Sequence, residues 1–298
     1  MNRLSVIVVN WNGEHLLADC LGPLTGGPFD VIVVDNASTD GSVQLLEKSR
    51  GSVRMIVNQA NRGFAVANNQ GIATAKTDYV LLLNNDTVPN TAALEAVVSF
   101  LDEHPAVAIV GPTLVNPDAS PQPSCGPGPN LWTELLGKTL LHRLLPGLRA
   151  KAPSQARAVD WVTGAALFAR TSVLRELGGL DEGMFMFYED LDLCARARER
   201  GHEVWFVPTA PIVHIGGAST RNVEAKSLVD SYRSTDRYFR QHGPSWRRWL
   251  VRAMTVVEMM VRSVIWTVLW LVPSKRTLAR LRLRAYSTIA RLAIGIGK

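Results

Sequence analysis

The first half of the sequence alternates short apolar runs rich in β-branched residues with segments of helical periodicity, and this alternation constrains the fold most. The apolar runs predict strands, and the segments between them predict helices. Such alternation is typical of an α/β domain with a largely parallel sheet. The predicted strands are Leu4–Val9, Phe29–Val34, Val53–Val57, Tyr79–Leu83 and Val107–Val110, and the predicted helices are His15–Leu21, Ser42–Lys48, Ala65–Ala75 and Thr91–Glu103.

The middle of the chain is less regular. Residues 116–130 are rich in Pro, Gly and Ser, which predicts a loop. A strand-like segment then covers Val159–Ala169, and helices are predicted at Thr171–Leu177 and Glu189–Arg200. The last of these begins with acidic residues and ends before Gly201, as expected for a helix whose charges match its dipole.

The composition is that of a globular protein. Of 298 residues, 47% are hydrophobic and 19% charged, which argues against a disordered chain. The N-terminus begins a strand almost at once and lacks the apolar run of a signal peptide, so we expect a cytoplasmic protein. Cys20, Cys125 and Cys194 form no CxxC pair, which predicts reduced thiols and no zinc site.

The basic charge is concentrated in the last 53 residues. Residues 246–298 carry eleven Lys or Arg and one acid, Glu258, although the net charge of the whole chain is only +6. Ala253–Val272 is mostly apolar but contains Glu258 and Arg262, and tryptophans lie in and before it. We expect a helix in a membrane interface. Packing on the domain or a second subunit, and a membrane-spanning helix, are the alternatives. Nucleic acid is not an expected partner.

Polar side chains follow the predicted strands where ligands bind in such sheets. Asp35 and Asn36 follow the second strand, where a carboxylate can accept hydrogen bonds from a base or ribose; the alternative for Asp35 is a local turn. Arg62 and Gly63 follow the third strand and open a helix that contains Asn68. A glycine there lets backbone N–H groups approach a phosphate, and Arg62 adds charge.

The segment Asn84-Asn85-Asp86 ends the fourth strand. Mg²⁺ or Mn²⁺ on a diphosphate needs one or two protein carboxylates, with phosphate and water completing its ligands. Asp86 is the only full anion of the three, so metal binding is predicted to depend mainly on it. The alternative interpretation is a polar turn before Pro89.

Two further positions are candidates for chemistry. Glu189 and Asp190 lie at the start of a predicted helix, directly after the apolar and aromatic segment 184–188. A carboxylate in such surroundings can have a raised pKa and act as a general base, although acids at helix starts are also ordinary caps. His214 lies among apolar residues, where a structural role is the simpler interpretation. The segment 161–165, which contains Trp161 and Gly164, is expected to lie under the acceptor or donor sugar; the alternative for Trp161 is a place in the core.

Several of these segments, taken in order, resemble the signatures of the family 2 inverting glycosyltransferases, which have the GT-A fold. The matching segments are VVDNASTDGS, NRGFAVANNQG, LLLNNDT, WVTGAALFAR and FMFYEDLDLCARARERG, over about residues 3–220. Within the family, the sequence is most similar to bacterial rhamnosyltransferases. Asn84 stands where the family's metal-binding DxD motif has its first aspartate.

The resemblance implies a role for each matching residue. Asp190, paired with Glu189, would be the catalytic base, and Asp86 would bind the metal together with His214. The remaining positions would contact the nucleotide-sugar donor: Asn10, Asn12, Asp35, Asn36, Arg62, Gly63, Asn68 and Asn85.

The resemblance also implies an organisation and a function. Residues 1–225 would form the GT-A domain, with a nucleotide-binding half at 1–115 and an acceptor half at 116–225, and residues 226–298 a helical, basic, membrane-associating tail. The expected activity is transfer of a hexose such as rhamnose from a dTDP- or UDP-linked donor, with Mg²⁺ or Mn²⁺. The acceptor would be lipid-linked or a polysaccharide of the cell surface, used at the inner face of the membrane, with homo-oligomerisation as an option. A non-catalytic nucleotide-sugar scaffold and a sugar-1-phosphate nucleotidyltransferase are the alternatives.

Overall fold

The computed structural model describes residues 3–49, 51–138, 153–216 and 224–296. The chain forms two compact units, which are described separately. The first, which we call the sheet unit, consists of Met1–Gly128, Ala150–Phe185 and Glu189–Ser219. The second, the helical unit, consists of Pro129–Arg149, Met186–Tyr188 and Thr220–Lys298. The short segment Met186–Tyr188 therefore packs with the helical unit, although both of its neighbours in sequence belong to the sheet unit.

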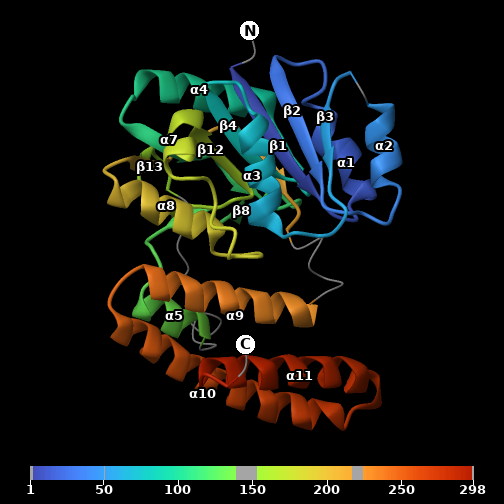
Figure 1. Cartoon of the computed structure of the whole chain (residues 1–298), viewed down its shortest axis with the longest axis vertical. Helices are drawn as coiled ribbons and strands as arrows, with labels where there is room; N and C mark the ends of the chain where they lie inside the picture. The colour runs from blue at the N-terminus through green and yellow to red at the C-terminus, as the bar shows by residue number, and fades with distance from the viewer. Residues whose placement is uncertain (1–2, 50, 139–152, 217–223, 297–298) are drawn as a thin grey trace. The chain divides into compact units, whose positions relative to one another are not determined.

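An eight-stranded, mostly parallel sheet forms the centre of the sheet unit (Figure 1), as the sequence predicted. Its order is β10-β13-β6-β12-β4-β1-β2-β3. Strands β1 to β4 run parallel to one another, whereas β12 is antiparallel to both β4 and β6. The strands are β1 (Leu4–Asn10), β2 (Phe29–Asp35), β3 (Arg54–Val57), β4 (Tyr79–Asn84), β6 (Val107–Gly111), β10 (Arg157–Ala158), β12 (Ala166–Arg170) and β13 (Glu203–Phe206).

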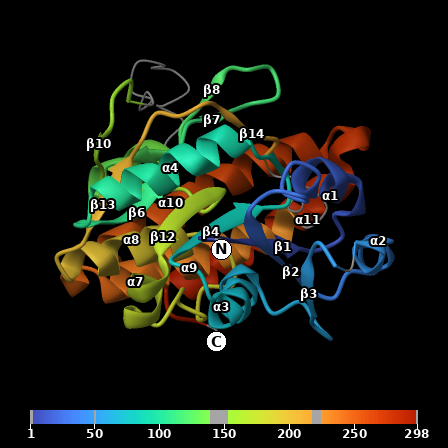
Figure 2. The same cartoon turned by 90° about the horizontal axis from the view of Figure 1, so that it is seen from above.

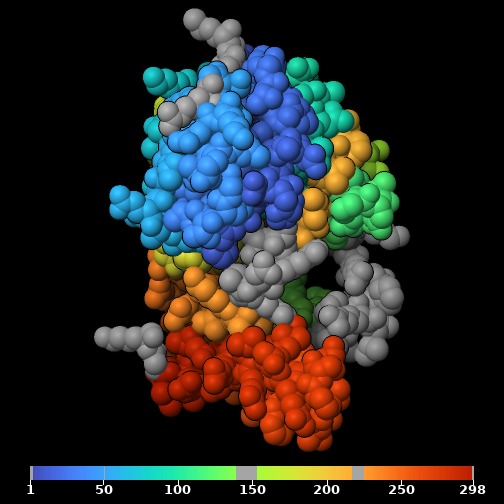
Figure 3. All heavy atoms as spheres, turned by 90° about the vertical axis from the view of Figure 1, so that its right-hand side faces the viewer, coloured from blue at the N-terminus to red at the C-terminus, as the bar shows by residue number. Residues whose placement is uncertain are grey.

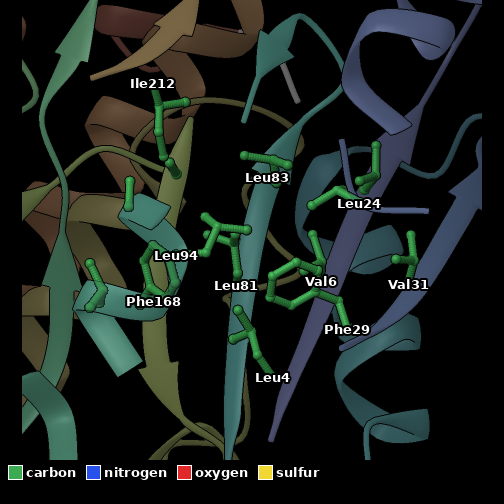
Figure 4. Close-up of a cluster of buried hydrophobic side chains, with 14 of the residues drawn as sticks. Leu4, Val6, Leu24, Phe29, Val31, Leu81, Leu83, Leu94, Phe168 and Ile212 are labelled. Carbon is green, nitrogen blue, oxygen red and sulfur yellow. The ribbon is translucent and has the colours of Figure 1, made fainter. Parts of the chain in front are cut away.

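Helices cover both faces of this sheet (Figure 2), so its central strands are apolar on both sides. Along β1, Leu4, Val6 and Val8 pack on one face and Ile7 on the other. Figure 4 shows the buried hydrophobic cluster that contains Leu4 and Val6, with Phe168 among its members. One face carries α1 (Glu14–Leu21), α2 (Ser42–Lys48) and α4 (Thr91–Glu103), and the other carries α3 (Phe64–Thr74), α7 (Thr171–Glu176) and α8 (Glu189–Glu199).

Two small sheets lie beside the large one, and part of them falls in the segment predicted to be a loop. One has the order β5-β14-β7-β8, and the other pairs β9 with β11. Residues 116–130 thus contain two short strands, because β8 pairs with the nearby β7 and β9 pairs with β11, which is distant in sequence. The strands are β5 (Thr87–Val88), β7 (Leu114–Val115), β8 (Pro121–Gln122), β9 (Cys125–Gly126), β11 (Trp161–Val162) and β14 (Ile212–His214).

The helical unit has a small core of its own, formed by Tyr232, Met259, Tyr286 and Ile289 among others. Figure 3 shows its surface in orange and red. Among the described residues, Ser245–Trp270 is the one helix long and apolar enough to cross a membrane by length and composition. The unit contains α5 (Leu131–Lys138), α9 (Glu224–Gln241), α10 (Ser245–Trp270), a 3-10 turn at Pro273–Lys275 and α11 (Arg276–Ala293).

Candidate active site

The ends of β1 and β2 are joined by buried polar side chains. Asn10 Nδ2 donates to Asp35 Oδ2 at 3.0 Å, and both residues are fully buried. Asp35 also accepts from the backbone N–H and the hydroxyl of Ser38, at 2.8 and 2.6 Å. Asn85 Nδ2 donates to Asn10 Oδ1 at 2.8 Å. Three predicted donor-site residues, Asn10, Asp35 and Asn85, are therefore brought together at one edge of the sheet. Asp35 also makes the local turn that was the alternative interpretation.

Hydrogen bonds of Asn12 and Asn36 connect the loops that follow β1, β2 and β3. Asn12 has a positive φ of 50° and its Oδ1 accepts from the Thr39 N–H at 2.7 Å. Asn36 Nδ2 donates to the Gly63 carbonyl at 3.0 Å, and its Oδ1 accepts from the Arg62 N–H at 3.1 Å. These contacts use the short polar side chains that such turns favour.

Two further predicted donor-site positions differ in their surroundings. Gly63 has φ +90°, and a Cβ there would lie 2.7 Å from the Phe185 carbonyl oxygen, so the position requires glycine. The Arg62 side chain is exposed. Asn68, in contrast, is buried and its Nδ2 donates to the Phe64 carbonyl of its own helix at 3.0 Å. No hydrogen bond in the described part of the chain links Asn68 to the other predicted residues.

Asp86 and His214 lie side by side where strands β5 and β14 pair. β14 pairs with β5 so that His214 lies opposite Thr87, and His214 Nε2 is 3.2 Å from Asp86 Oδ1 and 3.3 Å from Asn84 Nδ2. His214 Nδ1 lies 2.7 Å from Gln122 Oε1. Because an amide oxygen only accepts, Nδ1 must carry a proton, and in the neutral ring Nε2 then presents its lone pair. His214 is thus not simply a core residue.

This pair fits a divalent cation. Two ligand atoms at about 2.1 Å from one octahedral ion, and at right angles, are about 3 Å apart, close to the 3.2 Å between Asp86 Oδ1 and His214 Nε2. Gln122 would fix the ring as outer partners of metal-binding histidines do. Among the described residues no group of three or more His, Cys, Asp or Glu is arranged to hold a metal. Protein ligands would number two, with diphosphate and water supplying the others.

Asp190 is held at the same edge of the sheet. Its Oδ2 accepts from the Gly164 N–H at 2.8 Å, and its Oδ1 from the Leu191 N–H at 2.8 Å. The next residue after Gly164, Ala165, accepts from the Asn84 N–H at 3.0 Å. Asp86 follows two residues after Asn84. The carboxylates of Asp86 and Asp190 therefore lie at the same end of the paired strands β4 and β12.

Glu189 and Asp190 form an acid–base pair with divided roles. Glu189 is buried and its Oε2 has no hydrogen-bond partner among the described residues. Burial, and then the charge of Asp190, raise the pKa of Glu189 well above its usual range. Burial also raises the pKa of Asp190, whereas the N–H groups of Gly164 and Leu191 favour its charged form. Burial therefore favours the neutral form of Glu189 more than that of Asp190, which is partly exposed and accepts from two N–H groups.

Trp161 takes a structural position. Its Nε1 donates to the Pro127 carbonyl at 2.9 Å, and its ring packs against the buried cluster on the α3 side of the sheet. Gln122 is a contributor that residue patterns did not single out, whereas Gly164 lies in the segment that was expected to line a sugar site. Gln122 lies in the Pro- and Gly-rich segment, and only the pairing of β8 with β7 brings it beside β14.

Comparisons with known proteins agree with this fold. The sequence model of "Glycosyl transferase family 2" matches residues 5–149, and that of "Glycosyl transferase family group 2" matches residues 79–295. The chain is 29% identical over 291 residues to the N-acetylglucosaminyl-diphospho-decaprenol L-rhamnosyltransferase of Mycobacterium tuberculosis, covering 87% of this chain and 93% of that one. It is 30% identical over 190 residues to the pre-mycofactocin glycosyltransferase of the same organism, covering 62% and 37%.

Solved structures show the same architecture. Staphylococcus aureus TarS 1–349 superposes with a TM-score of 0.54 at 19% identity, covering 98% of this chain and 92% of that one. The mannosyltransferase PcManGT of Pyrobaculum calidifontis, solved with GDP-Man and Mn²⁺, gives a TM-score of 0.56 at 17% identity, covering 97% and 86%. The fold is that of the GT-A glycosyltransferases. The chain belongs to glycosyltransferase family 2 and is related to its rhamnosyltransferases.

Proposed function

We propose that this glycosyltransferase moves L-rhamnose, a hexose, from a dTDP- or UDP-linked donor to a lipid-linked acceptor, with inversion at the anomeric carbon. The acceptor chemistry follows the rhamnosyltransferase relative, whose acceptor is N-acetylglucosaminyl-diphospho-decaprenol and which this chain matches over nearly its whole length. The observation that carries the proposal is Asp190, a partly exposed carboxylate held by the Gly164 N–H at the edge of the sheet that also carries Asp86.

The proposed reaction is a single displacement. The acceptor hydroxyl oxygen forms a bond to the anomeric carbon as the bond from that carbon to the diphosphate oxygen breaks. Asp190 accepts the hydroxyl proton, and the nucleoside diphosphate leaves with the electron pair of the broken bond. Asp190 suits this step because burial raises its pKa while two N–H groups hold its oxygens in place. Burial raises the pKa of Glu189 and so favours its neutral form, which places the negative charge of the pair on Asp190.

The donor would bind along the polar edge made by the ends of β1, β2 and β4. Asn10, Asp35 and Asn85 form a connected hydrogen-bond network there. Asp86 and His214 would hold Mg²⁺ or Mn²⁺, which when bound offsets the negative charge of the diphosphate.

The helical unit would bring the enzyme to the inner face of the membrane, where a lipid-linked acceptor is presented. α10 exposes a broad apolar surface that includes Val257, Val264 and Val268. Exposed cations follow at Lys275, Arg276 and Arg280, suited to anionic headgroups. α10 also packs against α9 and α11, which favours a helix lying in the interface over one that crosses the bilayer.

The test is an assay of the purified chain with dTDP-L-rhamnose or UDP-L-rhamnose, synthetic N-acetylglucosaminyl-diphospho-polyprenol and MnCl₂. We expect a rhamnosylated lipid whose anomeric configuration, read by NMR, is opposite to that of the donor. A product that retains the donor configuration would contradict the single displacement. Donor binding with neither transfer nor donor hydrolysis would favour a non-catalytic scaffold.

A further inference from the structure

The segment Met186–Tyr188, directly before Glu189, is anchored to helices of the helical unit. Ser234 Oγ, on α9, donates to the Met186 carbonyl at 2.9 Å. The Tyr188 hydroxyl donates to Glu134 Oε1, on α5, at 2.6 Å. The Tyr188 ring also packs against Tyr238, with ring centroids 5.5 Å apart. Three residues of chain are therefore fixed by two hydrogen bonds and a ring contact.

The backbone of this segment is one that needs such anchoring. Phe187 and Tyr188 have φ of +68° and +67°, so two successive residues with large side chains are in the left-handed region. Non-glycine residues rarely adopt it, and bulky ones least of all. Strained residues of this kind persist only where surrounding contacts hold them, and they cluster at functional sites. Here they set the direction in which the chain enters α8 at Glu189 and Asp190.

Glu134 is itself held by a short series of charged groups. Lys138 Nζ lies 3.4 Å from Glu134 Oε2 and 3.7 Å from Glu258 Oε2, and Glu258 also accepts from Arg262 at 2.8 Å. The side chains of Glu134, Lys138 and Glu258 are at most 15% exposed. This arrangement accounts for Glu258, the one acid of α10. Together with Tyr188 and Tyr232, the three residues line a cavity of about 250 Å³ inside the helical unit.

We propose that the Tyr188–Glu134 hydrogen bond positions the catalytic carboxylate, which gives the helical unit a role in catalysis besides membrane contact. Tyr188 and Glu134 are positioning residues. They hold the left-handed backbone of Phe187 and Tyr188, which leads into the start of α8 and Asp190, and neither touches the reacting atoms. The inference rests on the proposed role of Asp190 as the base. Without the bond, the turn relaxes toward ordinary backbone conformations and Asp190 leaves the Gly164 N–H.

The activity test compares Tyr188→Phe, Glu134→Leu and Glu134→Gln in the full chain. Tyr188→Phe and Glu134→Leu should lower kcat about 10- to 100-fold with an unchanged KM for the donor, since a misplacement of about 1 Å can cost that much. Glu134→Gln keeps an acceptor oxygen for the Tyr188 hydroxyl, so it should retain most of the activity. The matched control is Tyr232→Phe. It also removes a tyrosine hydroxyl group from the wall of this cavity, but it should leave kcat unchanged.

A second readout does not depend on activity. Hydrogen–deuterium exchange of peptides covering residues 183–195 should be at least tenfold faster in Tyr188→Phe than in Tyr232→Phe, because the start of α8 loses its anchor. Equal exchange and equal kcat in these two variants would overturn the inference. An inactive wild-type enzyme whose Tyr188→Phe variant still shows faster exchange would count against the proposed function while upholding the anchoring.

Discussion

Asp86 Oδ1 and His214 Nε2 lie 3.2 Å apart, because the pairing of β5 with β14 brings together two segments far apart in the sequence. Gln122, from the neighbouring part of the same small sheet, fixes the His214 ring through Nδ1. If the pair binds a metal, Gln122 is its nearest support. Gln122→Ala should therefore weaken Mn²⁺ binding about 10- to 100-fold, the usual effect of removing such a partner.

Calorimetric titration of Mn²⁺ in the presence of UDP measures this change directly. Gln44→Ala is the control, since Gln44 is exposed on α2. Mn²⁺ affinity that is equal in the two variants would show that His214 needs no support from Gln122, or that it is not a ligand.

Gly13 packs against the asparagines of the donor edge. A Cβ at Gly13 would lie 2.6 Å from Asn10 Oδ1 and would collide with Asn85 Nδ2, although the Gly13 backbone, at φ −117°, suits any residue. Gly13→Ala should therefore displace both amides and weaken UDP binding at least tenfold, and it should also lower the Tm because buried hydrogen bonds are disturbed. Gly137→Ala, where a Cβ meets no atom within 4 Å, is the control. A Gly13→Ala variant with unchanged UDP affinity would remove this edge from the donor site.

Glu189 makes the stability of the protein depend on pH in a defined direction. Burial and the charge of Asp190 raise the pKa of Glu189, so the folded state binds this proton more tightly than the unfolded state does. Stability from this group is fully present below the pKa of the unfolded carboxyl and is lost as pH rises toward the raised pKa. Glu189→Gln is neutral at every pH. Its Tm should exceed that of the wild type at pH 7.5, and the difference should shrink toward pH 4.

Differential scanning calorimetry across this pH range provides the comparison. Glu103→Gln, at the exposed end of α4, is the control and should follow the wild type throughout. A Glu189→Gln variant that is less stable than the wild type at pH 7.5 would mean that Glu189 is ionised in the folded protein.

The exposed face of α10 should account for membrane binding. Val264 and Val268 are 66% and 62% exposed, so their replacement disturbs no core. The double variant Val264→Glu, Val268→Glu should lower partitioning onto phosphatidylglycerol-containing vesicles at least tenfold, because it puts two anions where apolar groups would enter the bilayer. Val57→Glu, at a 48% exposed valine of the sheet unit, is the control in vesicle sedimentation. Equal sedimentation of both variants would exclude this face.

The fold was largely predictable because local sequence patterns encode its main helices and strands. The strand predicted at Tyr79–Leu83 ends one residue later in the structure, and the helices at Ser42–Lys48 and Thr91–Glu103 have the predicted bounds. The two-residue strands β8 and β9 could not be predicted, because only their pairing determines them: β8 pairs with the nearby β7, and β9 with the distant β11. The predicted strand at Val159–Ala169 is divided into β11 and β12, with Gly164 between them.

The candidate site was predictable in its residue types but not in its supporting contacts. Asp35, Asp86 and Asp190 could be found because each follows an apolar segment and lies in a recognisable motif. Gln122 and Glu134 could not, since each acts through a residue far away in the sequence, His214 and Tyr188 respectively. Such pairings are set by tertiary packing, which periodicity and turn chemistry do not encode.

The central claim is that Asp190 removes the acceptor proton, and the most direct measurement is the single-turnover rate of sugar transfer by Asp190→Asn at saturating donor and Mn²⁺. The account predicts a rate about 10²- to 10⁴-fold below wild type with unchanged donor affinity, while Asp19→Asn, at an exposed position of α1, stays at the wild-type rate. A wild-type rate in Asp190→Asn would contradict the account.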